Sequence, residues 1–241
     1  MNWTTILVTE ARSNCVLRLE ELSRKYKRSE PVIRNSLRRY EQKGLVERVS
    51  SKLYINHLNQ QFSSQDLVNN IRPKSYISLE SALVEKGIIN QSPSALTCVS
   101  PAHSQSYNSK SANIVYRKIS PDLYWGYEEK STRYNNYLIA EPEKALLDWI
   151  YLNRQEGLPT PLDEFQLSFL SIPKLRKYAG RFPRTVQDTV KTSYSNVPFH
   201  HNERTMHHGS FLPRGDRRAR SGASRNSERE TQRSPSRLPN A

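Results

Sequence analysis

The chain has 241 residues, and its 37 Lys and Arg against 23 Asp and Glu give a formal net charge of +14. Hydrophobic residues make up 35% of the chain, below the roughly 45–50% of ordinary globular domains, so part of it is expected to lie outside a packed core. The absence of a long apolar run and the presence of only two cysteines exclude a transmembrane helix and a disulfide-stapled miniprotein, and predict a cytoplasmic protein with polyanionic partners.

The first 58 residues are predicted to form a domain of three helices followed by a β-hairpin. The hydrophobic periodicity places the helices at residues 3–12, 19–26 and 30–43. A short extended piece, residues 16–18, is expected between the first two helices. Ser29 is a favourable N-cap for the third helix, Pro31 fits its first turn, and Gly44 suits the position after its end.

One face of the third helix is predicted to be polar without an apolar interruption. The buried stripe is formed by Ile33, Leu37 and Tyr40. The opposite arc carries Arg34, Asn35, Arg38, Arg39 and Gln42. Arg pairs bidentately with guanine and Asn or Gln with adenine, and an α-helix fits the major groove of DNA. These five residues are therefore predicted to read bases or contact adjacent phosphates, although the pattern alone also fits an ordinary solvated helix face.

Two short apolar runs, residues 45–49 and 52–55, flank the Ser50-Ser51 turn and predict a hairpin. The order of helix, helix, recognition helix and two-stranded wing is typical of a winged helix-turn-helix domain. Arg48 and Lys52 lie near the predicted wing tip, where they are expected to contact phosphates or the minor groove. We therefore favour DNA binding over a wing-bearing protein–protein module.

Residues 59–71 are expected to be a polar connection with a short helical piece, and residues 72–194 an α+β domain. In this domain Ser78 is expected to cap a helix that runs through Lys86. Strands are predicted at residues 95–100, 114–119, 123–127 and 134–140. Further helices are predicted to open at Glu141 and to cover residues 172–179 and 183–192. The predicted fold class of the two domains together is α+β.

Residues 195–241 differ in composition from the rest of the chain. All nine basic residues there are Arg, and so few are apolar that the segment is predicted to be disordered. The segment fits a non-specific nucleic-acid arm, a tail without a specific role, or the product of a shifted reading frame after Tyr194. Its two His-His pairs, at 200–201 and 207–208, lack Cys or carboxylate at fixed spacing and do not predict a metal site.

Four segments of the middle block carry a family resemblance: SYISLESALVEKGII (75–89), LYWGY (123–127), YLIAEPEKALLDWIYL (137–152) and PKLRKYAGRF (173–182). Together with the N-terminal block they resemble the AbiEi family, the antitoxins of type IV toxin–antitoxin systems, over about residues 3–192. IAEPEKALLD (139–148) is the most specific piece, although Glu141 stands where Asp is more usual. The Arg-rich tail lies outside the family pattern.

The resemblance implies an N-terminal domain that binds inverted repeats in its own promoter and represses the operon. It also implies a second domain that counteracts a nucleotidyltransferase-like toxin without forming a stable complex. Because no phosphate-binding glycine motif or metal-ligand pattern is present, we expect no catalytic residue, no cofactor and no enzyme activity. The alternatives are a winged-helix regulator without a toxin partner, a DNA-processing enzyme targeted by the winged helix, and an RNA-associated basic protein.

The charges at the start of the helix at Glu141 could suggest acid–base chemistry. We interpret Glu141, Glu143 and Lys144 instead as solvated charges of a capped helix start, with Lys144 paired to Asp148 at i+4. The aromatic residues of this block are expected to pack in strands and core rather than to stack on bases. They are Tyr76, Tyr124, Trp125, Tyr127, Tyr134 and Tyr137.

Overall fold

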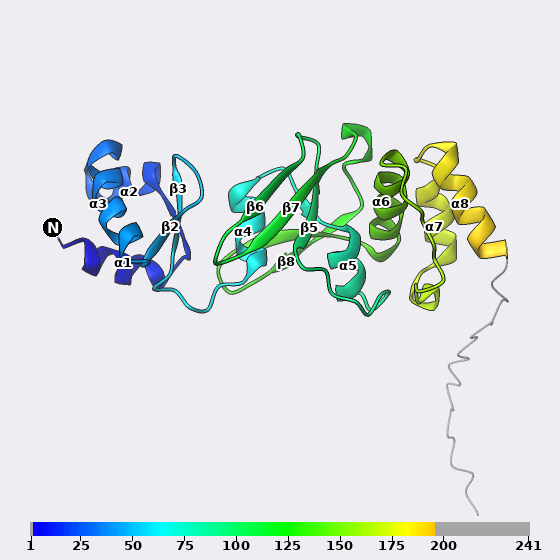
Figure 1. Cartoon of the computed structure of the whole chain (residues 1–241), viewed down its shortest axis with the longest axis horizontal. Helices are drawn as coiled ribbons and strands as arrows, with labels where there is room; N and C mark the ends of the chain where they lie inside the picture. The colour runs from blue at the N-terminus through cyan, green and yellow to red at the C-terminus, as the bar shows by residue number, and fades with distance from the viewer. Residues whose placement is uncertain (1, 196–241) are drawn as a thin grey trace, which may run out of the picture. The chain divides into compact units, whose positions relative to one another are not determined.

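Three helices and a small antiparallel sheet form the first part of the chain in the computed structural model, which describes residues 2–195 (Figure 1). The helices are α1 (Trp3–Ala11), α2 (Leu19–Tyr26) and α3 (Glu30–Gln42). The strands are β1 (Val16–Arg18), β2 (Val46–Arg48) and β3 (Leu53–Asn56). Strand β3 lies between the other two and pairs antiparallel with both. The predicted helices and hairpin are confirmed, and the expected extended piece is the third strand.

The core of this first part lies between the helices and the sheet. Its buried members are Leu7, Leu17, Leu19, Leu22, Ile33, Leu37, Val46 and Tyr54. Helix α3 ends where Gly44 adopts the left-handed conformation, with φ of +69°, as its position after the helix predicts. Ser29 occupies the N-cap position, but its side chain makes no capping hydrogen bond. The predicted N-cap position is therefore confirmed, but the side-chain hydrogen bond typical of such a cap is missing.

A six-stranded mixed sheet forms the centre of the second part. Its strands are β4 (Tyr76–Ile77), β5 (Leu96–Ser100), β6 (Gln105–Asn108), β7 (Asn113–Lys118), β8 (Tyr127–Ser131) and β9 (Asn136–Ala140). Their order is β6-β7-β5-β4-β9-β8. The β4–β9 and β5–β7 pairs are parallel, and the remaining neighbours are antiparallel. With helices and two sheets, the described chain has the predicted mixed α+β class.

Five helices accompany this sheet: α4 (Ser64–Ile71), α5 (Leu79–Glu85), α6 (Pro142–Gln155), α7 (Ile172–Ala179) and α8 (Arg184–Ser195). Helices α6, α7 and α8 pack against one another, as Figure 1 shows. Leu67 and Val68 of α4 are fully buried in the core around the six-stranded sheet. The segment predicted as a polar connection, residues 59–71, is therefore in part a packed element. Among residues 2–195, no helix combines the length and hydrophobicity needed to cross a bilayer.

The strand predicted at residues 123–127 is wrong. The chain forms a 3-10 turn at Pro121–Leu123, and Gly126 has a φ of +74°, which a regular strand does not accommodate. Strand β8 begins only at Tyr127. The short strands β4 and β6 were not predicted. The predictions made for the tail beyond Ser195, including the two His-His pairs, lie outside the described residues.

Candidate nucleic-acid interface

The polar residues predicted on the third helix share one solvent-facing side of α3. The buried residues Ile33 and Leu37 hold the opposite side of the helix against the core. The exposed residues are Arg34, Asn35, Arg38, Arg39 and Gln42. Because α3 is long enough for three turns, these side chains extend along one continuous surface. We call this surface the α3 arc.

The side chains of the α3 arc make no hydrogen bond and no ion pair within the part of the chain that the structure describes. Between residues 2 and 195, Arg34, Arg38 and Arg39 form neither a side-chain hydrogen bond nor an ion pair. The amides of Asn35 and Gln42 are likewise without hydrogen bonds there. Each guanidinium thus keeps its donors available for an external acceptor such as a base edge or a phosphate.

Contacts with α1 support the position of α2 and α3. The Glu10 carboxylate accepts hydrogen bonds from Lys25, at 2.7 Å, and from the Tyr26 hydroxyl. Burial and this contact with Glu10 raise the pKa of Tyr26 to about 12, so the hydroxyl remains a donor at neutral pH. The hydroxyls of Thr4 and Tyr40 form a hydrogen bond at 3.0 Å that joins α1 to α3. These contacts hold α3, and with it the α3 arc, in a fixed position relative to α1.

The turn between β2 and β3 carries the other two predicted residues. Arg48 and Lys52 are both exposed, and Arg48 Nε donates to the Ser50 carbonyl at 3.2 Å. Burial raises the pKa of Tyr54, and the Arg48 guanidinium opposes the rise, while the charges of Glu41 and Arg34 have smaller effects. Arg48 lies opposite Tyr54 in the pairing of β2 with β3, and Tyr54 is buried in the same core cluster as Ile33 of α3. The hairpin that carries the turn is therefore packed on the core that also holds α3.

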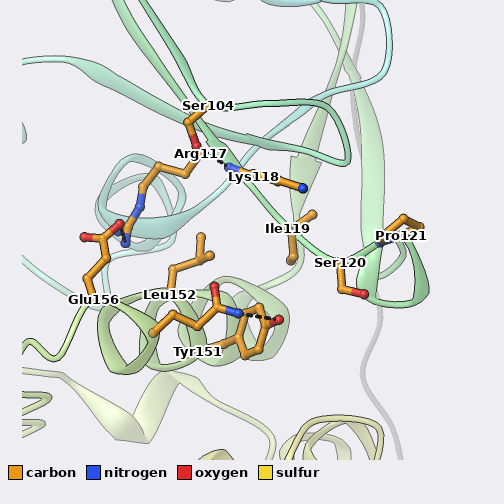
Figure 2. A pocket seen from close by; sticks show the side chains of 10 residues that line it. Ser104, Arg117, Lys118, Ile119, Ser120, Pro121, Tyr151, Leu152 and Glu156 are labelled. Atoms are coloured by element: carbon orange, nitrogen blue, oxygen red, sulfur yellow. Dashed lines mark hydrogen bonds and ion pairs between the residues drawn. The ribbon is translucent and has the colours of Figure 1, made fainter.

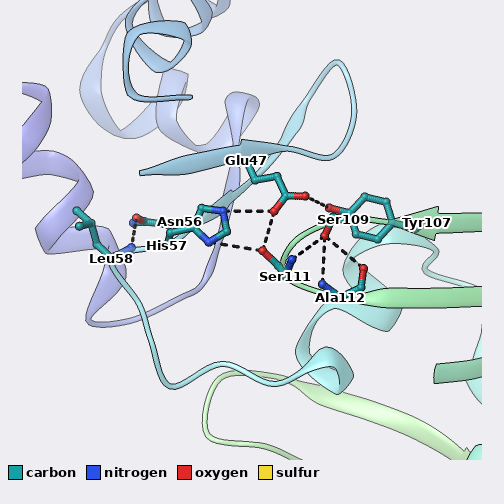
Figure 3. A network of polar contacts seen from close by, with 8 residues as sticks. All are labelled: Glu47, Asn56, His57, Leu58, Tyr107, Ser109, Ser111 and Ala112. Atoms are coloured by element: carbon teal, nitrogen blue, oxygen red, sulfur yellow. Dashed lines mark hydrogen bonds and ion pairs between the residues drawn. The ribbon is translucent and has the colours of Figure 1, made fainter. Parts of the chain in front are cut away.

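Glu47 links this hairpin to the six-stranded sheet. Its carboxylate accepts hydrogen bonds from Ser111 Oγ at 2.6 Å and from the Tyr107 hydroxyl at 3.1 Å, and lies 3.3 Å from His57 Nε2 (Figure 3). Although burial raises the pKa of Glu47, hydrogen bonds from hydroxyl groups hold it below its usual value. A second link joins Arg18 to Asn70 at 2.8 Å. Because Glu47 directly precedes Arg48, these contacts position the turn. Sequence reasoning missed them.

The helix start at Glu141, where solvated charges were predicted, contains a buried ion pair instead. The side chains of Lys144 and Asp148 are fully buried and in contact. The Tyr76 hydroxyl accepts from Lys144 Nζ at 2.7 Å and donates to Asp148 at 2.9 Å, and Ser78 Oγ donates to Asp148 at 2.9 Å. Glu143, only 3% exposed, accepts from the Ser171 amide. The interpretation as a solvated helix start is therefore wrong.

Aromatic rings complete the surroundings of this pair. The Lys144 ammonium lies 5.2 Å from the ring centroids of Tyr76 and Trp125 and 5.3 Å from that of Phe182. Burial lowers the pKa of Lys144 and raises that of Asp148. The four segments that carry the family resemblance thus meet around one lysine. Because every partner of the pair is internal, the cluster supports the fold and offers no reactive group to solvent.

Position 126, beside this cluster, is expected to accept only glycine without loss of stability. A Cβ added there would lie 3.0 Å from Cγ of Lys144, and the φ of +74° disfavours any other residue. We expect Gly126→Ala to lower the free energy of unfolding by about 2–4 kcal/mol, combining backbone strain with overpacking, as measured by denaturant titration. Gly157→Ala is the matched control, because Gly157 has a φ of +70° and open space around its Cα. Equal losses in the two variants would contradict the crowding at Lys144.

A cleft of about 470 Å³ lies between the end of β7 and the last turns of α6 (Figure 2). The guanidinium of Arg117 is held by Glu156 at 2.6 Å and by Asn153 at 3.2 Å. Gln155 donates to the Tyr151 hydroxyl at 2.8 Å. Arg117 and Glu156 thus form an ion pair at the wall of the cleft, and we assign no ligand to it.

Across residues 2–195, no three His, Cys, Asp or Glu side chains are grouped so as to hold a metal ion. In comparisons with known proteins, neither a family model nor a curated protein matched the chain.

Proposed function

We propose that the protein is a DNA-binding repressor in which residues 1–58 act as a winged helix-turn-helix domain. Helix α3 is the recognition helix, and the turn between β2 and β3 is the wing tip. The observation that carries this proposal is the α3 arc, whose exposed Arg, Asn and Gln side chains make no hydrogen bonds or ion pairs among the described residues. The excess of basic over acidic residues in this part of the chain adds attraction to a polyanion.

In this proposal α3 enters the major groove with the arc facing the bases. Arg34 and Arg38 donate in pairs to guanine, while Asn35 and Gln42 bind adenine. Arg39, at the edge of the arc, contacts a flanking phosphate. Arg48 and Lys52 contact the backbone beside the groove, where they set the position of the domain without reading sequence.

The direct test is binding of the full chain to the DNA upstream of its own gene. Fluorescence anisotropy would compare that duplex with a random duplex and with double-stranded RNA of the same sequence over a range of salt concentrations. We expect the upstream duplex to bind at least about 10³-fold more tightly than random DNA, as specific repressors do. Equal affinity for all three nucleic acids would contradict the proposal, and tighter binding to RNA than to either DNA would favour the RNA-associated alternative.

Loss of the Arg48 guanidinium is expected to weaken DNA binding without changing sequence preference. Arg48→Ala should lower affinity for upstream and random duplexes by the same factor and reduce the slope of log affinity against log salt by about 1. Salt titrations of both duplexes measure this. Arg154→Ala, at an exposed Arg on α6, should leave the slope unchanged. A selective loss on the upstream duplex would show instead that Arg48 reads bases.

We further propose that the repressor is an antitoxin that controls its own operon and counteracts a nucleotidyltransferase-like toxin without a stable complex. This role comes from the resemblance to AbiEi antitoxins, whose four resembling segments meet around Lys144. Co-expression with a neighbouring nucleotidyltransferase-like gene should restore growth that the toxin alone inhibits. Failure to restore growth, with DNA binding intact, would favour a regulator without a toxin partner, and metal-dependent cleavage of DNA by the pure chain would favour a processing enzyme.

A further inference from the structure

One exposed apolar side chain flanks the α3 arc. Val32 is 49% exposed and, by helical spacing, lies next to Arg39 just outside the predicted polar arc. Four large hydrophobic residues are exposed in the described part of the chain, and Val32 alone of these belongs to α3. The others are Val8, Leu158 and Phe169. Val32 therefore lies beside the hydrogen-bonding groups of the arc without contributing one itself.

Val32 lies in the first turn of α3, next to a predicted reader of bases. Asn35 follows one turn later on the same side, which places the two side chains about 5–6 Å apart. The Ser36 hydroxyl, four residues on, donates to the Val32 carbonyl at 3.0 Å and is thus engaged with the helix backbone. The N-terminal residues of a recognition helix contact base edges, so in the proposed docking of α3 the side chains of Val32 and Asn35 would face neighbouring base pairs.

The chemistry of the major groove restricts what an isopropyl group can recognise. Base edges there present hydrogen-bond donors, acceptors and one apolar group, the C5-methyl of thymine. Against a phosphate or a guanine edge, Val32 would leave polar atoms unpaired. Against the thymine methyl, both apolar surfaces leave water together.

We propose that Val32 contacts the C5-methyl group of a thymine adjacent to the adenine that Asn35 binds, and so selects thymine at one defined operator position. This inference rests on the proposed function, because it requires α3 to lie in the major groove. It adds an apolar determinant of specificity to the polar ones of the arc.

Replacement of thymine by deoxyuridine tests this contact, because it removes only the methyl group. The full chain would first select a duplex from a random pool, and each thymine of that duplex would then be replaced in turn. At one position we expect wild-type affinity to fall about fourfold, the factor for one buried methylene. Val32→Ala should bind the thymine duplex more weakly and be indifferent to the replacement there. Val8→Ala, at a similarly exposed Val on α1, should retain the full wild-type response.

The outcomes separate this inference from the proposed function. Wild-type affinity that is unchanged by every replacement would overturn the thymine contact, as would a Val32→Ala variant that keeps the same loss at the sensitive position. In both cases a selected duplex whose binding depends on Arg38 would leave the repressor proposal standing. Selection of no duplex at all would overturn the repressor proposal, and the thymine contact with it.

Discussion

Replacement of Asp148 by Ala is expected to lower the free energy of unfolding by about 3–5 kcal/mol. The reason is that Lys144, which is fully buried, would lose the only counter-ion that it contacts among residues 2–195. The hydroxyls of Tyr76 and Ser78 would also lose the carboxylate to which they donate. Chemical denaturation of the full chain, followed by circular dichroism, measures the loss.

Two further variants serve as controls for this prediction. Asp188→Ala removes an exposed Asp that lies 3.7 Å from Lys191, and is expected to change stability by less than about 0.5 kcal/mol. Lys144→Met combined with Asp148→Asn removes both buried charges but retains an acceptor for the two hydroxyls. This double variant should be more stable than Asp148→Ala alone, because no charge is left unpaired. A loss in Asp148→Ala as small as in Asp188→Ala would show that the pair does not support the fold.

These two Lys–Asp pairs have similar spacing along their helices, but one is buried and the other is exposed. Spacing along a helix predicts that Lys144 and Asp148 meet, and they do. Spacing does not reveal that the pair is buried, since burial depends on Tyr76 and Ser78, which lie about 70 residues away in the sequence. The contacts of Glu47 with Tyr107 and Ser111 are of the same long-range kind. A local pattern carries no signal for such contacts.

The elements of the first part could be predicted because their signals are local. The periodicity of Ile33 and Leu37 and the left-handed Gly44 are enough to define α3 and its end. Strand β6 (Gln105–Asn108) lies at the edge of its sheet and is mostly exposed, so it has no hydrophobic alternation to detect. The strand predicted at residues 123–127 was wrong for the opposite reason. Its aromatic residues suggest a strand, but Trp125 packs against Lys144 and Phe182.

The exposed residues of the α3 arc could be placed from the same periodicity, because a helix with one buried stripe must present the opposite side to solvent. The presence of Val32 beside them was overlooked, although its position follows from the same helical spacing. The position of Arg48 depends on the three-dimensional pairing of β2 with β3, in which Arg48 lies opposite Tyr54, a residue buried in the same core cluster as Ile33 and Leu37 of α3. Helical spacing therefore predicts which polar residues of α3 are exposed, whereas the position of Arg48 also depends on strand pairing.

Arg38→Ala is expected to weaken binding to the selected operator by about 1–3 kcal/mol, or roughly 5- to 150-fold, and to affect random DNA much less. Arg38 lies near the middle of α3 and has no partner among the described residues, so its guanidinium is free to donate two hydrogen bonds to one guanine. Its loss should also relax the preference at that single base pair. Anisotropy titrations on the operator, on its single-base variants and on random DNA measure all three effects.

Arg38→Lys separates base reading from simple charge. Lys keeps the positive charge but not the planar fork that contacts two acceptors on one base. We therefore expect Arg38→Lys to retain the salt dependence and the affinity for random DNA, yet to lose most of the operator preference that Arg38→Ala loses. If Lys instead restores operator affinity in full, Arg38 contacts a phosphate, and base reading must come from the other residues of the arc. Equal losses on operator and random DNA for Arg38→Ala would lead to the same conclusion, because contact with a phosphate is blind to sequence.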